Sequence, residues 1–344
     1  MARTAGNWTP PLPGDRLVRD CRRLPGPWVG SHDPPRPLQR CARALCRPGL
    51  RLRHTGSMAE FARRLPENVE GPFFIDSTCI DCDTCRQIAP ATFGEGADAS
   101  FVQVQPRTAE ERRLAYRALV ACPTASIGVS DKSGVAAAVR DFPVALEPGL
   151  FYCGFNSPKS FGGNSYFLRH ASGNWLIDSP RFVEHLARRF AEAGGVRYIF
   201  LTHRDDVADA ERYAERFRAE RIIHRLELSA QPDAERVLEG FEPVEVAPGF
   251  LAIPTPGHTR GHMVLLAEER WLFAGDHIWW SRNLKRLNAS REVCWYSWPQ
   301  QVASVRRLER YSFEWVLPGH GERVYLPREE MARAITRLAA AVRS

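Results

Sequence analysis

The chain of 344 residues has no long uninterrupted hydrophobic run and no internal repeat. No stretch approaches the roughly 18 apolar residues of a membrane span, so the sequence predicts no transmembrane helix and no membrane partner. The absence of a collagen period and of any repeat of about 20 to 50 residues excludes fibrous and solenoid classes. The composition that is present, 44% hydrophobic and 25% charged residues, is typical of a globular protein of roughly two domains.

Acidic residues are scarce at the N-terminus, and lysine is missing there. Residues 1–57 contain eleven arginines, no lysine and three aspartates, which gives this segment a charge of +8. The whole chain carries +7, so the rest of the chain is nearly neutral at −1. A basic chain normally suggests a nucleic-acid partner. Because the positive charge is confined to the N-terminal segment, we expect no nucleic-acid partner.

The same segment, 1–57, holds nine of the 26 prolines and has little hydrophobic periodicity. This composition favours a disordered leader. Three interpretations remain open: a basic tail, an organellar transit segment, or translated sequence upstream of a true start at Met58. We expect two folded domains after it, at 58–132 and 140–344.

The segment 58–132 reads as a small α+β domain. Strand-like runs lie at 73–75 and 101–104. Thr108 and Glu111 form a capping-box pattern, which predicts a helix that runs to about Ala121.

From 140 to 344, apolar strand-like runs alternate with amphipathic segments. This order predicts a layered α/β domain. We expect strands at 165–168, 175–177, 198–202, 221–224, 250–254, 263–266 and 271–274, and helices at 181–193, 208–219, 300–311 and 328–342.

Four of the nine cysteines form a regular pattern: Cys79, Cys82 and Cys85 lie three positions apart, and Cys122 precedes Pro123. Three thiolates at this spacing can wrap one tight loop around three corners of a cubane, and a remote Cys-Pro supplies the fourth ligand. A zinc site normally uses two cysteine pairs, and disulfides do not explain the spacing. The pattern therefore predicts an iron–sulfur cluster.

The cysteine segment resembles single-cluster bacterial-type ferredoxins. Two-cluster forms have a further cysteine before a proline, whereas this chain has Ala89 before Pro90. The resemblance implies one [4Fe–4S] cluster, or [3Fe–4S] if a corner is lost, with single-electron transfer and a redox partner protein. Asp81 and Asp83 would surround the cluster with negative charge and lower its potential. A cluster also favours a cytoplasmic location, or an organelle if the leader is a transit segment.

A second pattern consists of four short motifs spread over residues 203–320. His203 opens the first motif, and His258, Asp276 and His320 lie in Gly-His-Thr, Gly-Asp-His and Pro-Gly-His. Each motif follows a strand-like run, and loops at strand ends converge into sites. Imidazoles and carboxylates gathered in this way are typical metal ligands.

The order of these motifs resembles the metallo-β-lactamase fold, over residues 150–325. The resemblance implies an αββα sandwich with a metal site along one edge of its sheets. It further implies that His258, Asp276 and His320 are metal ligands and that Asp276 bridges two metals.

The first motif departs from the family pattern His-x-His-x-Asp-His. His203 matches, Asp205 replaces the second His, and the final Asp-His falls on 207–208, or on 209–210 if the motif is two residues longer. The resemblance then implies His203, Asp205 and His258 for site one. For site two it implies Asp209, His320 and the bridging Asp276, one imidazole short. Water, His277 or His262 could replace the missing ligand, or the second metal is absent.

These patterns support three hypotheses of function. In the first, the chain is a metal-dependent hydrolase: metal-activated water attacks a small ester-like substrate, and Asp205 or Asp206 acts as base beside Asp276. In the second, the cluster feeds electrons to a non-haem iron site, since exchanging imidazole for carboxylate suits iron or manganese better than zinc. In the third, the chain is a non-catalytic electron carrier or redox sensor.

Overall fold

The computed structural model describes residues 59–343, so the leader 1–57 and the alternative start at Met58 lie outside the described residues. Within residues 59–343, no helix is long and apolar enough to cross a membrane.

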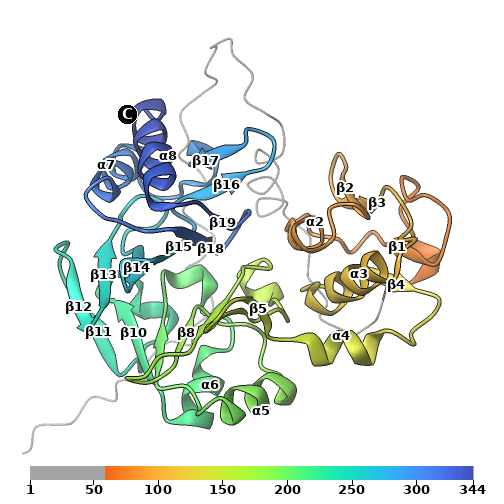
Figure 1. Cartoon of the computed structure of the whole chain (residues 1–344), viewed down its shortest axis with the longest axis horizontal. Coiled ribbons are helices and arrows are strands. Elements are labelled where there is room, and N and C mark those ends of the chain that lie inside the picture. Colours follow the sequence, from red (N-terminus) through yellow and green to blue (C-terminus); the bar gives the residue numbers. More distant parts are fainter. Residues whose placement is uncertain (1–58, 344) are drawn as a thin grey trace, which may run out of the picture. The chain divides into compact units, whose positions relative to one another are not determined.

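The first block is built from short elements that surround the cysteine segment (Figure 1). β1 pairs antiparallel with β4, and β2 pairs antiparallel with β3. The predicted capping box is present at the start of α3, where the Thr108 side chain accepts from the Glu111 N–H and the Glu111 carboxylate accepts from the Thr108 N–H. The elements are η1 (Phe61–Arg63), β1 (Phe73–Ile75), α2 (Thr84–Ile88), β2 (Phe93–Glu95), β3 (Ser100–Val102), α3 (Ala109–Ala121) and β4 (Ile127–Val129).

After α4 (Val135–Asp141), seven strands form a mixed sheet in the order β11-β10-β9-β8-β7-β6-β5. Strands β5 to β8 are antiparallel to one another, and β8 to β11 are parallel. The parallel strands are connected through α5 (Glu184–Glu192) and α6 (Ala210–Phe217), which bury Phe190 and Tyr213. The strands are β5 (Val144–Glu147), β6 (Leu150–Tyr152), β7 (Tyr166–Leu168), β8 (Trp175–Ile177), β9 (Tyr198–Phe200), β10 (Glu220–His224) and β11 (Arg236–Leu238).

A second sheet of six strands has the order β12-β13-β14-β15-β18-β19, and a hairpin of β16 and β17 lies outside it. Among residues 59–343, the 3-10 turns after η1 are η2 (Pro158–Ser160), η3 (Arg204–Asp206), η4 (Arg225–Ala230) and η5 (Arg291–Val293). The other elements are β12 (Val244–Ala247), β13 (Phe250–Pro254), β14 (Met263–Ala267), β15 (Trp271–Gly275), β16 (Trp279–Ser281), β17 (Arg286–Asn288), α7 (Trp298–Leu308), β18 (Trp315–Pro318), β19 (Val324–Tyr325) and α8 (Arg328–Ala341).

The second sheet is buried on both faces. In β14, Met263 and Leu265 belong to the core shared with the first sheet, while Val264 and Leu266 pack with α7 and α8. Alternate residues of a strand point to opposite faces, so this division places the second sheet between the first sheet and two helices. The result is the expected αββα sandwich, with α5 and α6 on the first sheet and α7 and α8 on the second (Figure 1).

The topology brings the motif loops to one edge of the sandwich. β15 and β18 are parallel neighbours, so the loops that follow them, with Asp276 and His320, start at the same end of the second sheet. β8 and β9 are likewise parallel neighbours, and Asp178 and His203 follow their ends. The carboxyl ends of parallel strands share an edge, where sites are commonly built.

Candidate metal centre and iron–sulfur site

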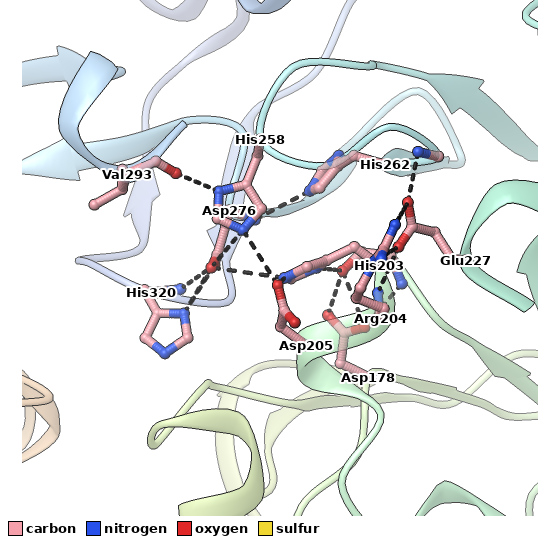
Figure 2. A network of polar contacts seen from close by, with 12 residues as sticks. Asp178, His203, Arg204, Asp205, Glu227, His258, His262, Asp276, Val293 and His320 are labelled. Atoms are coloured by element: carbon pink, nitrogen blue, oxygen red, sulfur yellow. Dashed lines mark hydrogen bonds and ion pairs between the residues drawn. The ribbon is translucent and has the colours of Figure 1, made fainter. Parts of the chain in front are cut away.

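The motif loops form two groups of metal-ligand atoms that share one carboxylate. Figure 2 shows the first group, together with His320 of the second. The first group is His203, His258 and Asp276, and the second is Asp206, Asp276 and His320. Within each group, the ligand atoms lie within 4.8 Å of one another. The structure therefore brings together four of the six residues that the family resemblance implied, His203, His258, Asp276 and His320, with Asp276 in both groups.

Asp205 lies at the rim of the first group. Its Oδ2 atom is 3.9 Å from Nε2 of His203 and 3.9 Å from Nε2 of His258. The side chain is 53% exposed, so the carboxylate faces both the imidazoles and solvent. This position suits either a ligand of the first group or a base beside it.

Asp209 does not lie with the second group, where the sequence analysis expected it. Its carboxylate accepts from Lys159 Nζ at 2.6 Å and from the Phe182 N–H at 2.9 Å. Asp206 occupies the expected place instead, beside Asp276 and His320. The chain turns through η3 directly after His203, and this tight turn buries Asp206 while Asp205 stays exposed.

Unpartnered polar atoms provide the test of whether these residues fit a metal. The Nε2 atoms of His203, His258 and His320 and both carboxylate oxygens of Asp206 are buried without a hydrogen-bond partner. Buried polar groups nearly always have a partner, and an isolated buried carboxylate is very costly. A cation between these atoms would supply the missing partner for all of them. The donor set therefore fits a metal centre with two positions.

Neighbouring groups fix the two imidazoles of the first group so that Nε2 is the free atom (Figure 2). The Thr202 hydroxyl donates to the Asp178 carboxylate at 3.0 Å, which leaves the Thr202 oxygen to accept from His203 Nδ1 at 3.0 Å. His258 Nδ1 donates to the Val293 carbonyl at 2.5 Å. A ring whose Nδ1 carries the proton has an Nε2 lone pair available for a metal.

His262 and His277, the two candidates for the missing ligand, lie outside both groups. His262 Nε2 accepts from the Asp276 N–H at 3.2 Å, and its Nδ1 donates to Thr255 Oγ1 at 2.9 Å, so both ring nitrogens are occupied. His262 therefore positions the backbone of Asp276. In contrast, neither ring nitrogen of His277 has a hydrogen-bond partner, and burial lowers the pKa of His277 to about 3.

The charges of the centre are arranged for a cation. Burial lowers the pKa of His203 to about 3, so this imidazole is in the neutral, ligand form. Burial, with Asp276 next, raises the pKa of Asp206 well above its ordinary value. Burial opposes the charged form of His320, but Asp276 and Asp206 outweigh it and raise its pKa to about 10. A proton on His320 thus holds the place of a metal, and metal binding would release it.

Two positioning carboxylates were missed by the sequence analysis. Asp178 follows β8, and a strand-end carboxylate next to the first motif was a signal that could have been used. Glu227 is buried in η4 and accepts from Arg204 Nε at 2.5 Å and from the Gly261 N–H at 2.6 Å. It ties the loop of the first motif to the loop of the second, and no motif around it marks this role.

The metal-ligand groups open onto a cleft of about 620 Å³. Trp295 and Tyr296, both about half exposed, form part of its wall, and aromatic residues commonly line substrate pockets. Three basic residues, Lys159, Arg204 and Arg260, also line it.

The four predicted cluster cysteines lie together around α2 and at the C-terminal cap of α3. All cysteines within residues 59–343 are free thiols. Burial raises the pKa of Cys79 to about 11, and the neighbouring Cys122 adds to this rise. Burial also raises the pKa of Cys82 and of Cys85. A neighbouring thiol adds to each rise, Cys122 for Cys82 and Cys79 for Cys85. Such mutual proximity fits a cluster that holds all four as thiolates.

Arg86 changes the expected electrostatics of the cluster loop. Its buried guanidinium donates to Asp81 at 2.6 Å, to Asp83 at 2.6 Å and to Ser100 Oγ at 2.7 Å. Asp81 and Asp83 both have left-handed backbone, with φ of 56° and 66°. Arg86 therefore holds the loop in this conformation. It also neutralises the negative charge of Asp81 and Asp83, which was expected to lower the reduction potential of the cluster.

We expect Arg86→Met to reduce cluster content strongly. Removing one partner of a buried ion pair costs roughly 3–5 kcal/mol, and here two carboxylates lose their contact with the same guanidinium. Iron and sulfide per chain after anaerobic purification measure the effect. Arg113→Met is the control, because Arg113 is half exposed and pairs with Asp141 outside the loop. Full cluster content and unchanged thermal stability in Arg86→Met would contradict this role.

Comparisons with known proteins agree with this geometry. Residues 75–129 match the family model for the 4Fe-4S single cluster domain of Ferredoxin I, and residues 159–320 match that of the metallo-beta-lactamase superfamily. No curated protein matches the chain significantly.

Similar solved structures include a metallo-beta-lactamase family protein from Thermus thermophilus, with 20% identity, 57% of this chain and 80% of that chain covered, and a TM-score of 0.41. A metallo-beta-lactamase from Cronobacter sakazakii has 19% identity, 58% and 93% coverage, and a TM-score of 0.41. An archaeal superfamily protein from Sulfolobus tokodaii has 18% identity, 55% and 85% coverage, and a TM-score of 0.38. By its family matches, the chain joins a single-cluster ferredoxin domain to a domain of the metallo-beta-lactamase superfamily.

Proposed function

We propose that this protein is a metal-dependent hydrolase of a small anionic ester-like substrate, with one [4Fe–4S] cluster in a ferredoxin-like domain at 58–132 and the hydrolase at 140–344. The observation that carries the proposal is the buried, unpartnered ligand set, of which Asp206, His258 and His320 line an open cleft of about 620 Å³. An open cleft that reaches metal ligands gives a substrate access to the centre.

The proposed ligands of the first metal position are His203, His258 and Asp276, with Asp205 beside them. Those of the second position are Asp206, His320 and the same Asp276. A divalent metal bound here supplies a Lewis acid that lowers the pKa of a bound water to about 7. The second position has two carboxylates and one imidazole, a harder donor set than the imidazole-rich family pattern.

The residues of the chain supply the other parts of the reaction. Asp205, at the exposed rim, is placed to take the proton of the attacking water, while Asp206 is buried and serves as a ligand rather than as a base. The water oxygen forms a bond to the acyl carbon or phosphorus, and the bond to the leaving oxygen or sulfur breaks. The leaving group takes a proton from Asp205 or solvent.

The substrate is expected to carry negative charge. Lys159 pairs with Asp209 and Arg204 pairs with Glu227, but Arg260 is exposed and has no ion pair within the described residues. A cation that is not neutralised by the protein can pair with an anionic substrate. Trp295 and Tyr296 offer apolar faces for the rest of the molecule.

We expect Arg260→Ala to raise KM for an anionic substrate about tenfold with little change in kcat, because a hydrogen bond to a charged group contributes about 1.5 kcal/mol. Zinc-loaded whole chain would be assayed on bis(nitrophenyl) phosphate and on neutral nitrophenyl acetate. Arg310→Ala, an exposed arginine outside the cleft, is the matched control. An equal loss on both substrates would argue against charge recognition, and no turnover of any ester or thioester would argue against hydrolysis.

Redox chemistry at iron is the second candidate. It is favoured by a donor set in which carboxylates, counting Asp205, are as numerous as imidazoles, and by an electron-transfer domain in the same chain. In this case the metal centre would bind iron in preference to zinc.

A further inference from the structure

A loop of the hydrolase domain, Phe161-Gly162-Gly163, touches the cysteine loop with one residue and the metal ligands with its neighbours. It follows η2 and precedes β7. Neither family motif includes it. Its contacts join two sites that the sequence presented as separate.

Gly162 lies against Cys82. A Cβ atom at this position would be 2.9 Å from Cys82 Sγ and 2.8 Å from its Cβ, and the backbone has φ of +87°, so only glycine fits. The Gly162 carbonyl accepts from Asn156 Nδ2 at 2.6 Å and from Thr84 Oγ1 at 3.3 Å. The Thr84 hydroxyl in turn accepts from Cys82 Sγ at 3.4 Å. Buried hydrogen bonds thus hold the Gly162 backbone on a cluster ligand.

The flanking residues lie against the second metal position. A Cβ atom on Gly163 would be 2.7 Å from Asp206 Oδ1. The Phe161 backbone carbonyl lies by the His320 imidazole. Its ring centroid is 6.4 Å from that of His320. Both ligands that are specific to the second position therefore touch this loop.

The separation of the two sites follows from these contacts. Consecutive Cα atoms are 3.80 Å apart, so the Cys82 sulfur and Asp206 Oδ1 are at most about 12 Å apart. The intervening space contains packed backbone with buried hydrogen bonds rather than open solvent. We infer that Cys82 and the Phe161-Gly162-Gly163 loop form an electron path from the cluster to a metal held by Asp206, Asp276 and His320.

The electron transfer is a balanced one-electron step. An external one-electron donor, such as a flavin radical or dithionite, reduces the cluster. The reduced cluster returns to its oxidised state as a ferric ion in the second position becomes ferrous, and no covalent bond forms or breaks. The inference rests on the metal centre proposed above but not on hydrolysis, which transfers no electron.

The first test uses EPR of the reduced cluster in the whole chain. We would load the metal centre with paramagnetic Co²⁺ or with diamagnetic Zn²⁺, which have the same charge. If the path exists, the cluster signal saturates at several-fold higher microwave power with Co²⁺ than with Zn²⁺. Asp276→Asn, which removes the ligand common to both positions, is expected to lose this difference. Asp209→Asn should keep it, because Asp209 is paired with Lys159 outside the centre.

The second test follows the electron directly. In iron-loaded oxidised protein, a flash-generated flavin radical would reduce the cluster, and we expect the cluster to be reoxidised as ferrous iron appears. Zinc-loaded protein should keep its cluster reduced. Identical saturation with bound Co²⁺ and bound Zn²⁺, or equal reoxidation with iron and zinc, would overturn the inference. Ester turnover by the zinc-loaded protein is independent of both results, so failure of the electron path and failure of hydrolysis are distinguishable.

Discussion

Asp276→Asn is expected to abolish metal binding at both positions of the centre and, with it, hydrolysis. Asp276 is the residue common to the two ligand groups, and the His320 proton and the buried imidazoles around it hold its pKa well below its ordinary value despite burial. An amide of the same size removes the shared negative charge. We expect metal affinity to fall by more than about 100-fold. Losing a residue that only hydrogen-bonds to a metal ligand already lowers the metal affinity about 10–100-fold, and Asp276 is itself a proposed ligand.

The measurement is metal content by mass spectrometry after dialysis, together with ester turnover. Asp209→Asn is the matched control, and it should keep both metals, because Asp209 pairs with Lys159. Asp206→Asn should lose the second metal and retain the first. Wild-type metal content in Asp276→Asn would contradict the shared role of Asp276, and metal loss in Asp209→Asn would restore the ligand set expected from the sequence.

The second large effect is expected at the cluster. Cys122→Ser removes the remote ligand at the C-terminal cap of α3, so the cluster should be lost or reduced to a three-iron form. Iron and sulfide per chain and EPR of the oxidised protein measure this, since a three-iron cluster is paramagnetic when oxidised.

Cys294→Ser is the control for this experiment, because Cys294 lies by the Gly257 carbonyl, away from the four cluster thiols. It should retain the full cluster. A complete four-iron cluster in Cys122→Ser, or cluster loss in Cys294→Ser, would show that the cluster ligands are assigned wrongly.

The secondary structure of the sandwich was largely predictable because its strands are short apolar runs with sharp ends. The runs predicted at 198–202 and 250–254 correspond to β9 and β13, and the runs at 165–168 and 175–177 correspond to the antiparallel pair β7 and β8. The hairpin of β16 and β17 was not predicted, because each of its strands has only three residues and shows no clear alternation of apolar and polar side chains.

The candidate metal site was predictable where a motif has fixed flanking residues and not where the chain departs from it. His258, Asp276 and His320 lie in short motifs after strands, so their convergence could be expected. Because of the turn η3, Asp206 rather than the expected Asp209 lies beside Asp276, and Asp209 pairs with Lys159 instead. The contact of Gly162 with Cys82 joins residues 80 positions apart, and no sequence period reports such a contact.

The most direct test of this account is the metal and sulfide content of the anaerobically purified whole chain, with EPR before and after dithionite. We expect four irons and four sulfides for the cluster, and up to two further metals that Asp276→Asn removes without loss of sulfide. Zinc as the further metal would favour hydrolysis, and iron with its own EPR signal would favour redox chemistry. A full cluster with no further metal, even after incubation with zinc or iron, would contradict the metal centre and leave an electron carrier or sensor.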